Sequence, residues 1–262
     1  WRVNVVTVFV VRDSCHRFTR PEMIRQTAAA DRDGRPAPTH FGPEGNDFEG
    51  IEALFKGYAE SGRGQFCHYI HDEVEAAKFG GEIGGFSAFE EIPEGTDLLL
   101  YEGLHGAVQT ETVDAAKYPD LLIGVVPIIN LEWIQKLHRD MNLRGYSREA
   151  VTTTFLRRMH DYVHYIVPQF SHTHINFQRV PMVDTSNPFI ARDIPTADES
   201  MVIIRFRDPR GVDFPYLLRM IHDSFMSRAN TIVVPGGKLD LAMQLILTPL
   251  IWKLMERRRQ WV

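Results

Sequence analysis

Residues 98–106 read LLLYEGLHG, so three leucines and a tyrosine run directly into Glu102, and two glycines follow. A continuous apolar run of this kind, without polar alternation, is typical of a strand buried on both faces of a sheet. A second such run, DLLIGVVPIIN, covers residues 120–130. We therefore expect two central strands, with Glu102 held rigidly where the first of them ends.

Further strand and helix patterns alternate along the chain. Runs rich in β-branched residues predict strands at 3–11, 97–103, 120–130, 175–184, 201–207 and 231–236. Helical periodicity occurs at 131–142, 148–167, 214–226 and 238–257. This order predicts an α/β fold with helices on both sides of a sheet, in which ligands bind at the carboxyl ends of strands.

Composition and charge limit the classes of function. The chain has 262 residues, is 44% hydrophobic and carries a formal net charge of −5, so we expect neither a nucleic acid nor a membrane as a partner. The two cysteines, Cys15 and Cys67, are too few for a disulfide framework and indicate a reducing, cytoplasmic setting. No apolar stretch approaches the ~20 residues of a membrane span.

A second polar strand end lies in VVRDSCHRFTR at residues 10–20. A carboxylate such as Asp13 can accept a proton from a substrate hydroxyl. The cationic side chains that follow it, His16, Arg17 and Arg20, can hold a phosphate by charge-assisted hydrogen bonds. A polar loop whose charges pair with one another is the alternative interpretation.

A stripe of charge marks NLEWIQKLHRDMNLRGY at residues 130–146. On a helix, Glu132, Lys136, Asp140 and Arg144 recur at every fourth position, and Arg139 lies beside them. Taken alone, this pattern is typical of a surface row of ion pairs worth ~0.3–0.5 kcal/mol each.

Two other motifs carry less weight. His160 and His164 in HDYVH are one turn apart, as in zinc-binding HExxH helices, but Asp161 replaces the Glu and no third ligand is evident. PGGKLD at 235–240 lacks the glycine spacing of a phosphate loop. The Met- and Leu-rich stretches at 217–226 and 241–250 indicate core-facing helices.

The stretches DSCHRF, YEGLHG and GVVPIINLEWIQKLHRD, in this order and spacing, resemble phosphoribulokinase, specifically the bacterial class of the phosphoribulokinase/uridine kinase family. The similarity continues through 157–200, 204–218 and 227–251 and covers nearly the whole chain. The resemblance implies a P-loop kinase-like, three-layer α/β/α fold with a mixed sheet. It also implies transfer of the ATP γ-phosphoryl group to O1 of ribulose 5-phosphate, which supplies ribulose 1,5-bisphosphate to the Calvin cycle.

The resemblance also implies roles for residues of this sequence. Asp13 matches the catalytic base, and Glu102 matches the carboxylate that holds the Mg²⁺ of Mg-ATP. Arg139 and Asp140 match a basic–acidic pair that assists transfer. The positions associated with the sugar phosphate and the cleft are His16, Arg20, Lys136 and Arg144.

Bacterial members of the family are activated by NADH and form octamers, so the resemblance implies an allosteric homo-octamer. The guanidinium group suits a dinucleotide pyrophosphate. The arginines expected in such an effector pocket are Arg158, Arg205 and Arg228.

The sequence departs from the family at its beginning. No glycine-rich phosphate loop occurs, so we expect residues 1–262 to be a single phosphoribulokinase domain that lacks the N-terminal strand, loop and first helix. Val11 and Arg12 stand where the family has Glu-Gly. The alternatives are a uridine-kinase-like enzyme, a non-catalytic effector-binding or scaffold subunit and, last, a zinc hydrolase built on HDYVH.

Overall fold

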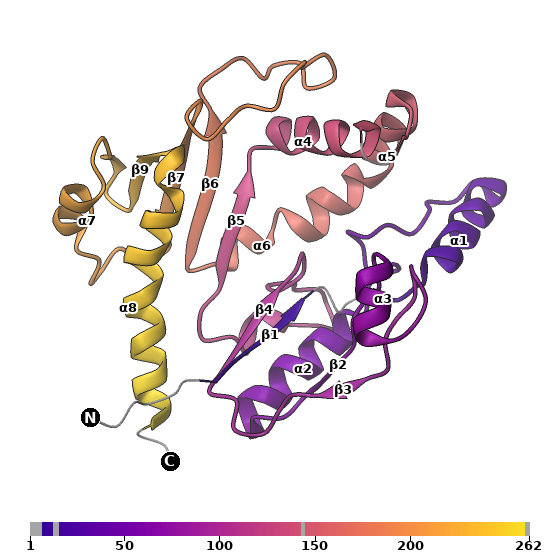
Figure 1. The fold of residues 1–262 in the computed structure, drawn as a ribbon, viewed down its shortest axis with the longest axis horizontal. Coiled ribbons are helices and arrows are strands. Elements are labelled where there is room, and N and C mark those ends of the chain that lie inside the picture. The colour runs from indigo at the N-terminus through magenta and orange to yellow at the C-terminus, as the bar shows by residue number, and fades with distance from the viewer. Residues whose placement is uncertain (1–6, 13–15, 143–144, 260–262) are drawn as a thin grey trace. The chain divides into compact units, whose positions relative to one another are not determined.

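The structure is a computed structural model that describes residues 7–12, 16–142 and 145–259. Two compact units make up the chain, and each is treated separately below. The first comprises residues 1–120 and 157–172, and the second comprises residues 121–156 and 173–262. Figure 1 colours both by position in the sequence.

The first unit contains a parallel strand pair, a small antiparallel pair and several helices. Its strands are β1 (Val8–Arg12), β2 (Gln65–Phe66), β3 (Glu90–Glu91) and β4 (Leu98–Glu102). Its helices are α1 (Arg20–Asp33), α2 (Phe48–Ser61), α3 (Glu73–Phe79), the 3-10 turn Ala115–Lys117, the end of α5 (Arg148–Asp161), the π-helical turn Tyr162–Ile166 and α6 (Gln169–His172).

The β1–β4 pair packs one face onto the apolar side of α2. Val11 is fully buried with Phe48 and Ile51, and Leu99 and Tyr101 pack against the same cluster. On the opposite face Val8, Val10 and Leu100 are exposed. The prediction that 97–103 is buried on both faces is therefore wrong for the described residues, because only alternate side chains of β4 enter the core.

The second unit is built on a five-stranded mixed sheet of order β5-β6-β7-β9-β8. Its strands are β5 (Ile123–Pro127), β6 (Ile175–Pro181), β7 (Ser200–Phe206), β8 (Phe225–Arg228) and β9 (Thr231–Pro235). The β5–β6 pair is parallel and the other pairs are antiparallel. The predicted mixed α/β class is confirmed.

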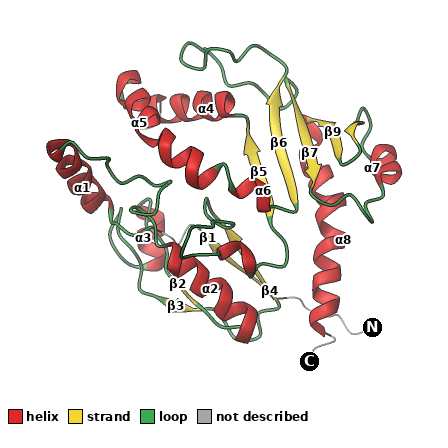
Figure 2. Ribbon diagram, turned by 180° about the vertical axis from the view of Figure 1, so that it is seen from behind, coloured by secondary structure: helices red, strands yellow, loops and turns green. Residues whose placement is uncertain are grey.

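Helices pack onto this sheet and extend from it. They are α4 (Ile129–Asn142), the first part of α5, α7 (Phe214–Met220), the 3-10 turn Gly236–Lys238 and α8 (Leu239–Arg259). Leu217, Ala242 and Ile246 are buried in one cluster with β6, β7 and β9, so the Met- and Leu-rich helices do face a core as predicted. Figure 2 shows α8 running beside the yellow sheet.

Two further expectations are wrong. The helix predicted at 214–226 ends at Met220, and the chain re-enters the sheet as β8. Val125 of β5 is 59% exposed, so 120–130 is not buried on both faces among the described residues. Within the described segments, no helix combines the length and apolar character needed to cross a membrane.

Candidate active site

The carboxyl ends of β1 and β4 meet at one edge of the first unit. The strands are parallel and in register, and their last residues, Arg12 and Glu102, are partners. Arg12 Nε lies 3.7 Å from Glu102 Oε2, with both side chains largely exposed. Asp13 follows Arg12 in sequence and lies outside the described residues. The two strand ends therefore lie side by side as far as the end of β1.

Glu102 has the chemistry of a magnesium ligand. Its side chain is 69% exposed, so its oxygens can reach a ligand at the strand end. Mg²⁺ retains several waters and takes one or two carboxylates together with substrate phosphates, rather than a cage of protein ligands. No cluster of three His, Cys, Asp or Glu side chains able to hold a metal occurs in the described parts of the chain. A single exposed carboxylate fits Mg²⁺ carried in on a nucleotide.

His16 is half-buried in an aromatic setting that sequence reasoning missed. Its ring centroid lies 4.9 Å from that of His40 and 4.7 Å from that of Tyr69, both in edge-to-face geometry. Its backbone forms an isolated bridge with Asn46. These neighbours are far away in sequence and belong to irregular segments, so no periodicity indicated them. The structure adds His40 and Tyr69 to the candidate site.

Arg20 opens helix α1, where a sequence signal fixes the start. Thr19 and Glu22 form a capping box, and Pro21 follows in the first turn. The Arg20 N–H donates to the Gly84 carbonyl oxygen at 2.6 Å, and a Cβ on Gly84 would lie 2.7 Å from Arg20 Cβ. The exposed Arg20 side chain therefore stands at the positive end of a helix dipole, which favours an anion.

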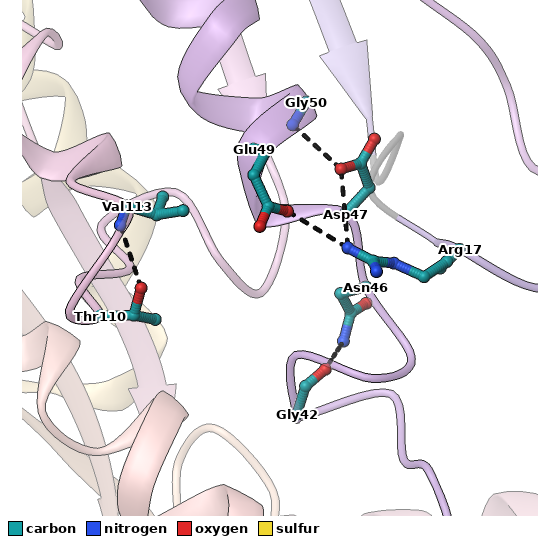
Figure 3. A network of polar contacts seen from close by, with 8 residues as sticks. All are labelled: Arg17, Gly42, Asn46, Asp47, Glu49, Gly50, Thr110 and Val113. Carbon is teal, nitrogen blue, oxygen red and sulfur yellow. Dashed lines mark hydrogen bonds and ion pairs between the residues drawn. The ribbon is translucent and has the colours of Figure 1, made fainter.

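Arg17 pairs with two acidic side chains at the start of α2. Its Nη2 lies 3.2 Å from Glu49 Oε2 and 3.9 Å from Asp47 Oδ1. Asp47 in turn caps α2 by accepting from Gly50 N–H at 3.1 Å. Figure 3 shows this network beside the bond from Asn46 to the Gly42 carbonyl oxygen. The paired-charge interpretation therefore holds for Arg17.

A buried ionic cluster lies on α4 in the second unit. Asp140 is 4% exposed, and its Oδ2 accepts from Lys136 Nζ at 2.5 Å. Its Oδ1 accepts from Arg139 Nε at 3.3 Å. Burial alone would raise the pKa of Asp140, but hydrogen bonds and charges from Lys136 and Arg139 hold that pKa below its usual value. Arg144 lies outside the described residues.

The charged residues on α4 are therefore not a row of solvent-exposed ion pairs. Lys136 is 17% exposed, and its Nζ also lies 5.9 Å from the centroid of the Phe155 ring. Phe155 stacks on Trp133 at 4.8 Å, and Trp133 contacts Phe189 at 5.3 Å. These aromatic residues come from α4, α5 and the loop between β6 and β7, which are separate segments of the sequence. Their proximity is therefore visible only in the folded structure.

The arginines expected for an effector occupy different settings. Arg158 stacks over the Phe41 ring at 5.8 Å in the first unit. In the second unit, Arg205 on β7 and Arg228 on β8 are both register partners of Thr231 on the strand between them. The structure thus brings Arg205 and Arg228 to one row of the sheet, with both side chains exposed.

The carboxylate of Glu102 at the end of a strand and the basic–acidic cluster on α4, on a mixed α/β fold, fit a phosphoryl-transfer enzyme. The profile described as "Phosphoribulokinase / Uridine kinase family" matches residues 2–186. The chain belongs to this family.

Individual relatives resemble nearly the whole chain. The chromosomal phosphoribulokinase of Cupriavidus necator is 62% identical over 259 residues, which cover 99% of this chain and 89% of that protein. The phosphoribulokinase of Nitrobacter vulgaris is 60% identical over the same shares. The solved structure titled phosphoribulokinase from Rhodobacter spheroides has a TM-score of 0.89 and 56% identity, covering 96% of this chain and 88% of that one.

Proposed function

We propose that this protein transfers the γ-phosphoryl group of ATP to O1 of D-ribulose 5-phosphate, giving ribulose 1,5-bisphosphate and ADP. The observation that carries the proposal is the 62% identity to a phosphoribulokinase across 99% of the chain. The product class, a sugar bisphosphate, fits a site with several cationic side chains, because two phosphate groups must be held at once.

In the first unit, the proposed roles are assigned to Glu102 at the end of β4 and to residues that come after β1 in the sequence. Asp13 takes the proton from the O1 hydroxyl as O1 bonds to the γ-phosphorus and ADP leaves. Glu102 would hold the Mg²⁺ of Mg-ATP, and the ion would supply charge neutralisation at the transferring phosphoryl group. His16 and Arg20 bind the phosphate of the sugar, one from an aromatic setting and one from the positive end of α1.

In the second unit, the cluster on α4 supplies charge. Arg139 and Asp140 assist transfer of the phosphoryl group, Lys136 contributes to binding of the sugar phosphate, and Asp140 accepts hydrogen bonds from both cations through its two oxygens. Arg144, close behind in sequence, binds the sugar phosphate. Phosphoryl transfer depends chiefly on such positioning and charge, with little covalent chemistry by the protein.

The same resemblance supports our proposals for how the enzyme is regulated and how its subunits assemble. NADH activates the enzyme, and the candidate effector-binding residues are Arg158 in the first unit and Arg205 and Arg228 in the second. The protein works as a homo-octamer in the cytoplasm. The register that makes Arg205 and Arg228 partners of the same residue, Thr231, with both arginine side chains exposed, supports the effector role, because guanidinium groups suit a pyrophosphate.

The test is turnover by protein expressed from its full gene, with Mg-ATP, NADH and ribulose 5-phosphate. We expect ADP release and a product with two phosphate resonances in the phosphorus NMR spectrum. Uridine offered in place of the sugar phosphate should not react, because a nucleoside has no phosphate for the basic residues to bind. Phosphorylation of uridine alone would select the uridine-kinase-like alternative, and no turnover of either would select the non-catalytic one.

A further inference from the structure

Asp161, a partly buried carboxylate that is not one of the proposed catalytic groups, holds one end of the loop at residues 39–46. It is the last residue of α5, next to the π-helical turn, and its side chain is 13% exposed. Its Oδ2 accepts from the Thr39 hydroxyl at 2.7 Å. Thr39 Oγ1 in turn accepts from the Phe41 N–H at 3.0 Å, which closes a local turn.

The loop docks on Asp161 with little space to spare. A Cβ on Gly42 would lie 2.4 Å from Asp161 Oδ2, so the carboxylate lies directly on the Gly42 backbone. A Cβ on Gly45 would lie 2.1 Å from the Thr39 carbonyl oxygen, so the two ends of the loop touch. The ring of Phe41 contacts Tyr162 at 5.7 Å. A loop packed so closely has little freedom to shift independently of Asp161.

Two routes lead from this loop to His16. In the first, His40, which directly follows Thr39 in the sequence, packs its ring edge-to-face on the His16 ring, with 4.9 Å between the ring centroids. Along the second, Asn46 Nδ2 donates to the Gly42 carbonyl oxygen at 2.7 Å. The Asn46 backbone forms the bridge with His16, and Asn46 is fully buried (Figure 3). The loop therefore holds His16 by its ring and by its backbone.

We infer that Asp161 is a positioning residue for sugar-phosphate binding. By holding Thr39 and Gly42, it sets the place of His40 and Asn46 and thus the orientation of the His16 imidazole. The inference rests on the proposed function for its consequence, because His16 is assigned there to the sugar phosphate. A shift of about 1 Å in a binding group is enough to cost up to ~100-fold in activity.

The test compares Asp161→Ala with Asp161→Asn. The alanine removes the acceptor of the Thr39 hydroxyl, whereas asparagine keeps an oxygen at nearly the same place. Asp31→Ala is the matched control, because Asp31 pairs with Arg157 on the same helix and both side chains are more exposed. If Asp161→Ala fails to fold, the same hydrogen bond can be tested from the threonine. Thr39→Val removes the donor hydroxyl, and Thr39→Ser keeps it.

We expect Asp161→Ala to raise the KM for ribulose 5-phosphate about 10-fold or more, with kcat and the KM for ATP within about 3-fold of wild type. Asp161→Asn and Asp31→Ala should stay close to wild type in all three constants. An unchanged sugar-phosphate KM in Asp161→Ala overturns the inference. So does a uniform loss of kcat and of both affinities, because that pattern is a general structural defect.

A second readout does not depend on turnover. The rate at which diethyl pyrocarbonate modifies His16, followed by peptide mass spectrometry, should change in Asp161→Ala and stay at the wild-type rate in Asp31→Ala. An unchanged rate in Asp161→Ala overturns the positioning role. If wild-type protein does not phosphorylate ribulose 5-phosphate, the proposed function fails, and the His16 modification rates still decide whether Asp161 positions that residue.

Discussion

Arg12 and Glu102 are register partners at the carboxyl ends of two parallel strands, with Arg12 Nε 3.7 Å from Glu102 Oε2. The pair is loose, since the two side chains are 76% and 69% exposed, and such exposed pairs contribute ~0–1 kcal/mol. Glu102 is therefore available to a cation that binds more strongly than a guanidinium. The arginine beside it becomes a competitor of that cation.

The first prediction concerns Glu102 as the proposed magnesium ligand. Glu102→Gln removes the negative charge but keeps the shape of the side chain. We expect kcat to fall about 10²–10³-fold, and the Mg²⁺ concentration for half-maximal rate to rise. Titration of initial rates with Mg²⁺ at fixed ATP measures both effects.

The control for that experiment is Glu94→Gln. Glu94 is a 90% exposed carboxylate of the first unit whose ion pair with Arg63 is long, at 3.6 Å. We expect this variant to keep the wild-type Mg²⁺ dependence. An identical Mg²⁺ titration curve for Glu102→Gln and wild type would refute the assignment of Glu102.

The second prediction concerns Arg12, the register partner of Glu102. Arg12→Ala removes the competing cation, so the Mg²⁺ concentration for half-maximal rate should fall about 2–5-fold, the size of a weak exposed pair. The effect should shrink at high ionic strength, because salt screens exposed charges. Rates measured across Mg²⁺ and NaCl series would show it, and a higher Mg²⁺ requirement in Arg12→Ala would contradict the competition.

The third prediction concerns the arginine row on the sheet of the second unit. Arg205→Gln and Arg228→Gln each remove the guanidinium group from one of the two register partners of Thr231. We expect the ratio of the rates with and without NADH to fall at least about 10-fold, as for loss of a charge-assisted pair worth ~1.5–3 kcal/mol. Arg210→Gln is the control, because Arg210 is bound to Asp208 and lies in an exposed turn. Full activation of both test variants would exclude this row as the effector site.

The parts of the site that follow regular elements could be predicted from the sequence. The periodicity of apolar residues and the positions of strand ends predicted β4, β5 and α4 to within a few residues, because a strand or helix fixes where its side chains point. Glu102 and the Lys136–Asp140 pair are therefore where the pattern indicated. The spacing of the charged residues on α4 alone predicts a row of surface ion pairs. The resemblance to phosphoribulokinases indicates instead that these residues belong to the active site, and the burial of Asp140 agrees with that interpretation.

The parts that depend on contacts between distant segments could not be predicted. The setting of His16 comes from His40, Asn46 and Tyr69 in irregular stretches, where no period reports which way a side chain points. One omission was avoidable. Helix α2 has an N-cap at Asp47, a glycine at position 62 and buried Phe48, Ile51, Leu54 and Phe55 at helical spacing, all readable in the sequence.

The last prediction concerns Lys136 and the pH dependence of the cluster on α4. The pKa of Asp140 is lower in the folded protein than its ordinary value of 3.8, so the carboxylate contributes stability above that pH, and the contribution is lost as pH falls through the lowered pKa.

Lys136→Met removes the cation at 2.5 Å, whose hydrogen bond and charge oppose the effect of burial, so the pKa of Asp140 should rise. The free energy of unfolding at neutral pH should fall by about 1–3 kcal/mol. The loss of stability on acidification should begin at a higher pH than in wild type. Urea unfolding at fixed protein concentration, from neutral pH to about pH 4, measures both. In Arg139→Gln, whose cation is half-exposed and 3.3 Å from the carboxylate, both changes should be smaller. Equal effects in the two variants would show that Lys136 is not the main partner of Asp140.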